Sequence, residues 1–116
     1  MSYTCAIIEA EPLAEATLKR YIARTDFLDL VWTAASAEEA ERKESVDLLW
    51  VAMTTASIEP DGALVRVLTN HEQVILVSIY PQGPDITLAN LVDFLTKPIS
   101  FDAFTEAMGK FLAWQS

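Results

Sequence analysis

The sequence predicts an α/β fold in which one parallel β-sheet is covered by helices on both faces. Strand-like apolar segments and segments with helical spacing alternate five times along the 116 residues, and such alternation requires parallel strands joined by right-handed crossovers. The third apolar segment, Val46 to Met53, also lacks the regular change between polar and apolar positions that marks a half-exposed strand. This pattern is typical of a central strand that is buried on both sides.

The first strand and helix are predicted near the amino terminus. Tyr3 to Ile8 is mostly apolar, as expected for a strand. Glu11-Pro12 marks a helix start, because proline lacks the amide that would stay unbonded in the first turn. Spacings of three and four residues then predict one buried stripe on this helix, formed by Leu13, Thr17, Leu18, Tyr21 and Ile22.

A second strand is predicted from Phe27 to Ala34. The segment that follows matches a capping box, in which the Ser36 oxygen accepts a hydrogen bond from the Glu39 amide and the Glu39 side chain reaches back. We expect this short helix to end near Lys43, before the central strand.

A polar loop from Met53 to Ile58 is predicted behind the central strand, and Glu59-Pro60 then starts another helix. Gln73 to Ser78 is a fourth strand, as apolar as the third. The buried face of the helix between them is predicted to consist of Leu64, Val67 and Leu68.

The last third of the chain contains one short strand and two helices. Tyr80 to Pro84 interrupts regular structure and leaves room for a short helix from about Asp85 to Asn90. Val92 to Leu95 is the fifth strand, and Ser100 caps a final helix. The apolar positions of that helix are Phe101, Phe104, Met108, Phe111 and Leu112. The whole pattern predicts one domain, residues 1–116, with the flavodoxin-like (βα)5 three-layer sandwich and strand order 2-1-3-4-5.

Composition excludes several classes of partner. The net charge of −9 argues against nucleic acid, because affinity for a phosphate backbone comes from clustered lysine and arginine. Lys19, Arg20 and Arg24 are best interpreted as a solvated helical face. No apolar run approaches a membrane span and no signal peptide begins the chain. Cys5, the single cysteine, is predicted to be a buried thiol, which favours a reducing, cytoplasmic setting.

Chemistry is expected where the strands end, because the carboxyl ends of parallel strands share one edge of the sheet. Glu9, Ala52, Ser78 and Lys97 stand at those positions. Their surroundings resemble the receiver domain of bacterial two-component response regulators, especially the variety attached to LytTR-type DNA-binding domains. The resemblance covers nearly the whole chain, and its main segments are Ile7 to Ala14, Val46 to Met53, Val74 to Ser78 and Val92 to Ser100.

The departures from this family matter as much as the match. Receivers carry a phosphoacceptor aspartate at the position of Ala52, and alanine offers no nucleophile. The metal-binding acidic pair of the family corresponds to Glu9 and Ala10, so two of the three usual acids are missing. Because Mg²⁺ requires several oxygen ligands, we expect neither a bound metal nor another cofactor. Glu11 is expected at the helix entrance.

Other parts of the family pattern are retained. The resemblance implies that Lys97 matches the lysine that pairs with the phosphoryl group, while Ser78 and Phe94 match the switch residues. It also makes the bond before Pro98 a candidate for a cis peptide. A lysine facing a partly buried pocket needs a partner, and we therefore hypothesise that Lys97 pairs with Glu9.

These observations favour a pseudo-receiver that is not an enzyme and acts by binding another protein or a second receiver, with a homodimer as one form. The family's usual partner face corresponds to residues 85–90, 92–95 and 101–114, including Trp114. Two alternatives remain open: phosphorylation on another carboxylate such as Glu9 or Asp61, and a role as the regulatory front part of a LytTR-type transcription regulator.

Other chemistry is disfavoured. A Ser78–Lys97 nucleophile would need an oxyanion hole and a substrate cleft, and the acidic turn from Glu9 to Pro12 would repel a flavin phosphate. His71 is interpreted as a surface histidine. Trp32 and Trp50 are interpreted as packing residues.

Overall fold

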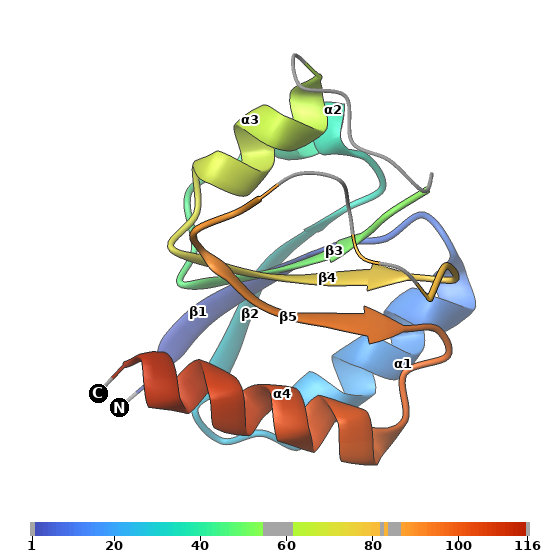
Figure 1. Cartoon of the computed structure of the whole chain (residues 1–116), viewed down its shortest axis with the longest axis vertical. Helices are drawn as coiled ribbons and strands as arrows, with labels where there is room; N and C mark the ends of the chain where they lie inside the picture. Colours follow the sequence, from blue (N-terminus) through green and yellow to red (C-terminus); the bar gives the residue numbers. More distant parts are fainter. Residues whose placement is uncertain (1, 55–61, 82, 84–86, 116) are drawn as a thin grey trace.

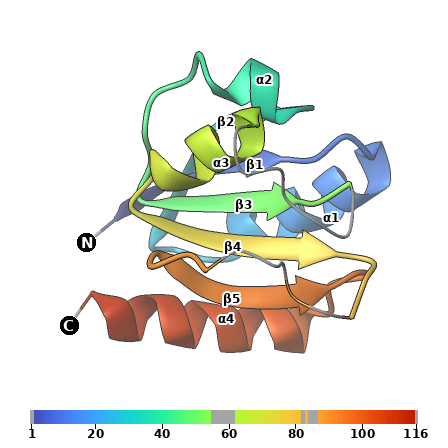
Figure 2. The same cartoon turned by 45° about the horizontal axis from the view of Figure 1, so that its top comes forward.

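The computed structural model of the chain describes residues 2–54, 62–81, 83 and 87–115, and it confirms the predicted fold. Five parallel strands form one sheet in the order β2-β1-β3-β4-β5. The strands lie between two pairs of helices (Figure 1), and the arrowheads of β3, β4 and β5 point the same way (Figure 2). The elements are β1 (Tyr3–Ile8), α1 (Pro12–Ala23), β2 (Leu28–Ala34), α2 (Ala37–Ala40), β3 (Leu48–Ala52), α3 (Ala63–Thr69), β4 (Gln73–Ser78), β5 (Leu91–Thr96) and α4 (Phe101–Trp114).

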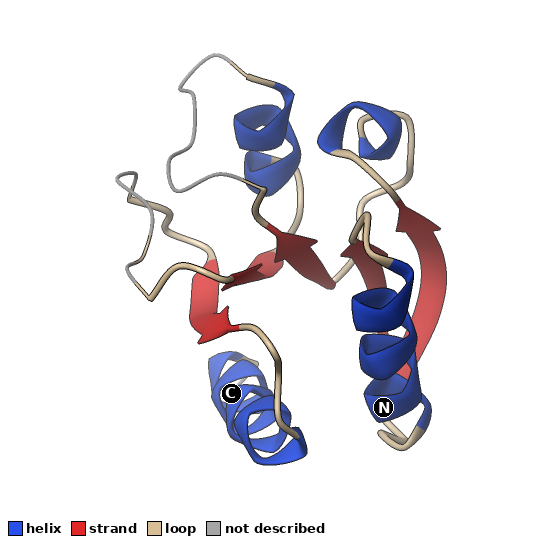
Figure 3. Ribbon diagram, turned by 90° about the vertical axis from the view of Figure 1, so that its right-hand side faces the viewer, coloured by secondary structure: helices blue, strands red, loops and turns tan. Residues whose placement is uncertain are grey.

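Two apolar cores hold the three layers together. Helices α1 and α4 cover one face of the sheet, and α2 and α3 cover the other (Figure 3). On β3, Leu48 and Trp50 belong to the core under α1 and α4, whereas Leu49 and Val51 belong to the core under α2 and α3. All four side chains are fully buried. The uninterrupted apolar composition of this strand is therefore explained by burial on both faces.

The helix starts follow the predicted chemistry with one difference. Glu11 is the N-cap of α1 and Pro12 is its first residue. Ser100 Oγ accepts a hydrogen bond from the Ala103 amide at 3.0 Å and caps α4. At α2 the Ser36 oxygen accepts from the Glu39 amide at 3.2 Å as expected, but the Glu39 side chain accepts from the amide of Ala35 at 3.1 Å, one residue before the cap.

The short helix predicted around residues 85–90 is not found in its described part. Residues 87–90 are not helical, and residues 85 and 86 lie outside the described residues. The Asn90 side chain donates to the carbonyl oxygens of Leu68 and His71 at 2.8 and 2.9 Å. These bonds hold Asn90, directly before β5, against the end of α3. The predicted loop from 55 to 58 and the Glu59-Pro60 start also lie outside the described residues, and α3 begins at Ala63.

The predicted buried stripes are wrong at their ends. Leu13, in the first turn of α1, is 85% exposed, and Phe101 and Leu112, near the two ends of α4, are 37% and 39% exposed. The stripe members buried as predicted are Leu18, Ile22, Phe104, Met108 and Phe111. Helical spacing identifies the side of a helix that faces the sheet, but it does not say how far along the helix the sheet extends.

His71 is a second correction, because it is buried rather than on the surface. Its Nδ1 accepts a hydrogen bond from the Val46 amide at 3.0 Å, and its ring lies 6.0 Å from that of Trp32. Burial lowers the pKa of His71 below its ordinary value. The histidine thus serves as a neutral acceptor at the start of the segment that leads into β3.

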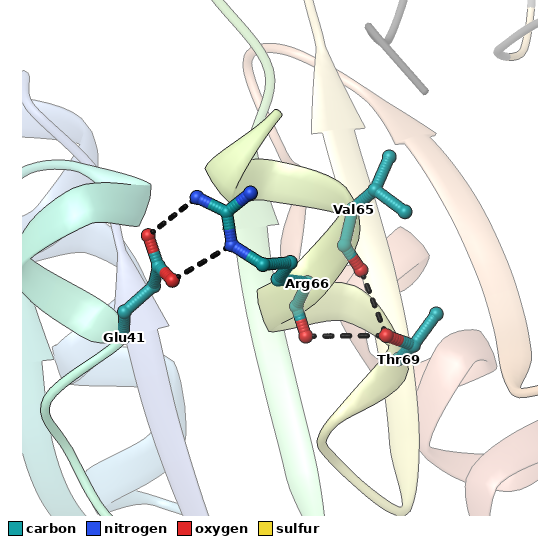
Figure 4. Close-up of polar contacts among 4 residues, drawn as sticks. All are labelled: Glu41, Val65, Arg66 and Thr69. Atoms are coloured by element: carbon teal, nitrogen blue, oxygen red, sulfur yellow. Dashed lines mark hydrogen bonds and ion pairs between the residues drawn. The ribbon is translucent and has the colours of Figure 1, made fainter. Parts of the chain in front are cut away.

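An ion pair connects the two helices on this face. Glu41, directly after α2, accepts two hydrogen bonds from the Arg66 guanidinium on α3, at 2.9 and 3.1 Å, in a fork geometry (Figure 4). The hydrogen bonds from Arg66 lower the pKa of the Glu41 carboxyl. One turn further on, Thr69 Oγ1 donates to the carbonyl oxygens of Val65 and Arg66 (Figure 4).

Within the described part of the chain, no helix is long and apolar enough to span a bilayer.

Candidate functional site

The four residues predicted at the strand ends share one edge of the sheet. Ala52 closes β3 opposite Val77, and Ser78 closes β4 opposite Thr96. Glu9 follows β1 and Lys97 follows β5. The parallel register therefore brings residues 9, 52, 78 and 97 to the same end of the molecule, although up to 88 positions separate them in the sequence.

Lys97 pairs with two carboxylates. Its Nζ lies 2.8 Å from Glu9 Oε1 and 3.1 Å from Glu11 Oε1. The hypothesised pair with Glu9 is present, and the contact with Glu11 is an addition, because sequence reasoning placed Glu11 only at the helix entrance. Glu9 also accepts a hydrogen bond from the Glu11 amide at 3.2 Å.

The environment of this cluster keeps Lys97 charged. Side-chain exposure is 14% for Lys97 and 8% for Glu9. Burial opposes the charged ammonium, but the hydrogen bonds and charges of Glu9 and Glu11 outweigh it and raise the pKa of Lys97. Contacts with two carboxylates leave the ammonium at most one of its three N–H donors for a further anion.

The polar groups of Ser78 bond to backbone amides near the strand ends. Its side chain is buried, and its Oγ accepts a hydrogen bond from the Tyr80 amide at 3.0 Å. Its carbonyl oxygen accepts from the Lys97 amide at 2.8 Å, next to a cis peptide bond between Lys97 and Pro98. The Lys97 ammonium bonds to Glu9 and Glu11 instead of the serine hydroxyl, so the geometry does not favour a Ser-Lys nucleophile. Phe94, half-buried on β5, packs against the core under α2 and α3.

A hollow of about 370 Å³ opens beside this cluster, and we call it the edge pocket. The cluster residues Glu9, Glu11 and Lys97 contribute polar groups. The apolar wall includes Leu13, Trp50, Ala52, Ile79, Pro98 and Ile99. Sequence reasoning missed Leu13 as a pocket residue because its spacing matched the buried stripe, and it missed Ile79 because the residue follows a strand without any motif.

The residues at this edge do not fit Mg²⁺. Ala10 and Ala52 have no side-chain oxygen, and Glu9 is already bonded to an ammonium, whereas Mg²⁺ is held by carboxylate and other oxygen ligands. Among the described residues, no group of three or more histidine, cysteine, aspartate or glutamate side chains is placed to hold a metal ion.

No family model matches the sequence, and no curated protein matches it. Solved structures do match the fold. The response regulatory domain of mrkE from Klebsiella pneumoniae has a TM-score of 0.71 and 16% identity, covering 97% of this chain and 98% of that chain. A LuxR-family two-component response regulator from Aurantimonas has a TM-score of 0.73 and 20% identity over 98% of this chain and 87% of its own.

A third match shows that this fold also occurs inside longer chains. PhyR from Brucella abortus, a response regulator, has a TM-score of 0.73 and 19% identity; 99% of this chain and 49% of PhyR are covered. Strand order, the crossovers and these matches agree with one another. The chain therefore has the fold of response-regulator receiver domains.

Proposed function

We propose that the chain is a receiver-like signalling domain that works without phosphorylation, because Ala52 stands at the position of the phosphoacceptor, and that it acts by binding another protein. The observation that carries this proposal is the 2.8 Å ion pair between Lys97 and Glu9. In the family that the sequence resembles, the lysine at this position pairs with the phosphoryl group. Here Glu9, a carboxylate of the chain itself, pairs with the lysine instead.

The missing nucleophile supports the same proposal. Ala52 stands at the end of β3 and has no oxygen with which to attack a phosphoryl donor. Glu9 is a poor substitute acceptor, because both of its oxygens are engaged, one by Lys97 and one by the Glu11 amide. Asp61, the other alternative, lies outside the described residues.

Intact-mass measurement after incubation with acetyl phosphate and Mg²⁺ tests the proposal. We expect no gain of a phosphoryl group by the unmodified chain. The double variant Ala10→Asp/Ala52→Asp restores the two missing acids and serves as the matched control for phosphorylation. A phosphoryl adduct on the unmodified chain would overturn the proposal, wherever the adduct lies.

The partner surface is proposed by family resemblance on β5 and α4. Leu112 and Trp114 of α4 are large apolar side chains that are partly exposed, and partly exposed aromatic residues are common in interfaces. Sedimentation velocity across a wide concentration range tests the homodimer. If that assembly forms, Leu112→Glu should prevent it, whereas Val31→Glu, an exposed substitution on the β2 edge, should not.

A reducing cytoplasmic setting is part of the same proposal. Burial, with a smaller effect from the Asp29 charge, raises the pKa of the Cys5 thiol to about 12. A buried protonated thiol is unreactive, which fits a structural role inside β1.

A further inference from the structure

The edge pocket has the size and composition of a small-molecule site. Its volume of about 370 Å³ falls within the range of pockets that hold small organic ligands. Leu13 and Ile79 stand at its rim with 85% and 64% of their surface exposed. Covering aliphatic side chains of this size removes apolar surface from water and favours binding.

The charged side chains that line the edge pocket do not balance one another. Two carboxylates, Glu9 and Glu11, face one ammonium, Lys97, which leaves a net charge of −1. Glu9 by itself pairs with Lys97 at 2.8 Å. Glu11 is 69% exposed, so it can turn toward a cation while Lys97 keeps its buried partner.

An anionic ligand would be repelled by the same carboxylates that attract a cation. Its negative group would approach two carboxylates, and the nearby ammonium is already paired with both of them. A neutral apolar ligand would cover Leu13 and Ile79 but would gain nothing from Glu11. Charge complementarity therefore favours a ligand that carries a positive group next to an apolar body.

We propose that the edge pocket binds a small amphipathic cation, with its apolar body against Leu13, Ala52 and Ile79 and its amine paired with Glu11. The proposal rests on the proposed function in one respect, because a phosphoryl group at this edge would occupy the same space. The two can fail separately: phosphorylation is detected by mass, and ligand binding is detected on protein shown by mass to be unphosphorylated.

Trp50 provides a reporter inside the pocket wall. Trp50 lines the pocket, and its indole Nε1 is buried without a hydrogen-bond partner among the described residues. The resonance of this indole N–H in a nitrogen-proton NMR spectrum is therefore expected to respond when the adjacent cavity is filled. The other two tryptophans, Trp32 and Trp114, do not line the pocket and act as internal references.

The test titrates the unmodified chain with 4-phenylbutylamine, 4-phenylbutanol and 4-phenylbutyrate, three probes that share one apolar body. We expect saturable shifts of the Trp50 indole signal and of the Ala52 and Ile99 amides. The amine should bind about threefold more tightly than the alcohol, as expected for one exposed ion pair, and the carboxylate should bind most weakly. Absence of saturable shifts at these signals, or butyrate binding as tightly as the amine, would overturn the proposal.

Matched variants distinguish specific binding in the edge pocket from nonspecific binding elsewhere on the protein. Glu11→Gln should abolish the preference for the amine over the alcohol, whereas Glu38→Gln on α2 should preserve it. Leu13→Ser should weaken binding of all three probes about fivefold through lost apolar contact, and Val31→Ser on β2 should leave it unchanged. Equal effects of Leu13→Ser and Val31→Ser, or a preference for the amine that survives Glu11→Gln, would count against the edge pocket as the binding site. Both side chains are exposed, and thermal unfolding of each variant checks that the fold is intact.

Discussion

Lys97 and Glu9 show how two largely buried opposite charges depend on each other. Both side chains are largely shielded from water, and removing one member of such a pair leaves the other as an uncompensated charge. The net gain from the pair is small compared with the penalty for breaking it. Its structural role is therefore best measured by comparing single and double substitutions.

We expect Lys97→Met to destabilise the domain by about 2 kcal/mol, below the value for a fully buried pair because Lys97 keeps some contact with solvent. The double variant Glu9→Gln/Lys97→Met should recover at least half of that loss, since the one carboxylate left without its partner, Glu11, is 69% exposed to solvent. Urea unfolding of the two single variants and the double variant gives the coupling free energy. Additive losses would show that the two side chains act independently.

His71 makes a second residue-level prediction. Its pKa is lowered in the folded state by burial, so protonation favours the unfolded chain. The stability contributed by the neutral ring is fully present above the ordinary pKa of 6.5 and is lost as the pH falls from there through the lower folded-state pKa.

His71→Gln keeps an acceptor for the Val46 amide but does not titrate. We expect its free energy of unfolding to depend less on pH than that of the unmodified chain between neutral and mildly acidic conditions. Urea unfolding at a series of pH values is the measurement. Parallel pH profiles for the two proteins would contradict this assignment.

Among the elements, α4 shows how a helix is both started by the sequence and positioned by packing. Ser100 caps its first turn, and Phe104 stacks on Trp50 of β3 with ring centroids 5.2 Å apart and planes 8° from parallel. The cap determines where the helix begins. The aromatic stack determines how it lies on the sheet.

Ser100→Ala removes the cap and should destabilise the domain by about 1 kcal/mol. Ser100→Asp keeps a side-chain acceptor and adds a negative charge at the helix start, so it should be nearly neutral. Chemical denaturation of both variants distinguishes a capping effect from a general intolerance of substitution at this position. Equal losses in the two variants would contradict the capping role.

For the molecule as a whole, acidity decides which partners are excluded. The chain carries a net charge of −9, and Lys19, part of its small basic group on α1, already pairs with Glu15 at 2.9 Å. We expect no binding to mixed-sequence duplex DNA in a mobility-shift assay at low ionic strength, because few cations are free to replace counterions on phosphates. A shift that disappears with added salt would refute this expectation.

Features that depend on neighbouring residues in the chain could be predicted from the sequence. The five strands, the proline at the start of α1 and the cap of α4 depend on residues close together in the chain, and they were predictable from spacing and local chemistry. The pairing of Lys97 with Glu9 was also predictable, because a known fold brings the two positions to one edge and a partly buried ammonium requires a counter-charge.

The sequence by itself determined the three-layer arrangement with its strand order, the residues at the strand ends and the absence of an acid at position 52. Tertiary structure alone decided that Leu13 is exposed, that His71 is buried under Val46, and that Glu11 joins Glu9 on Lys97 beside an apolar pocket. The physical reason is that periodicity describes each element in isolation. Exposure and pairing at the ends of elements depend on which other elements reach them, and that is a property of the assembled fold.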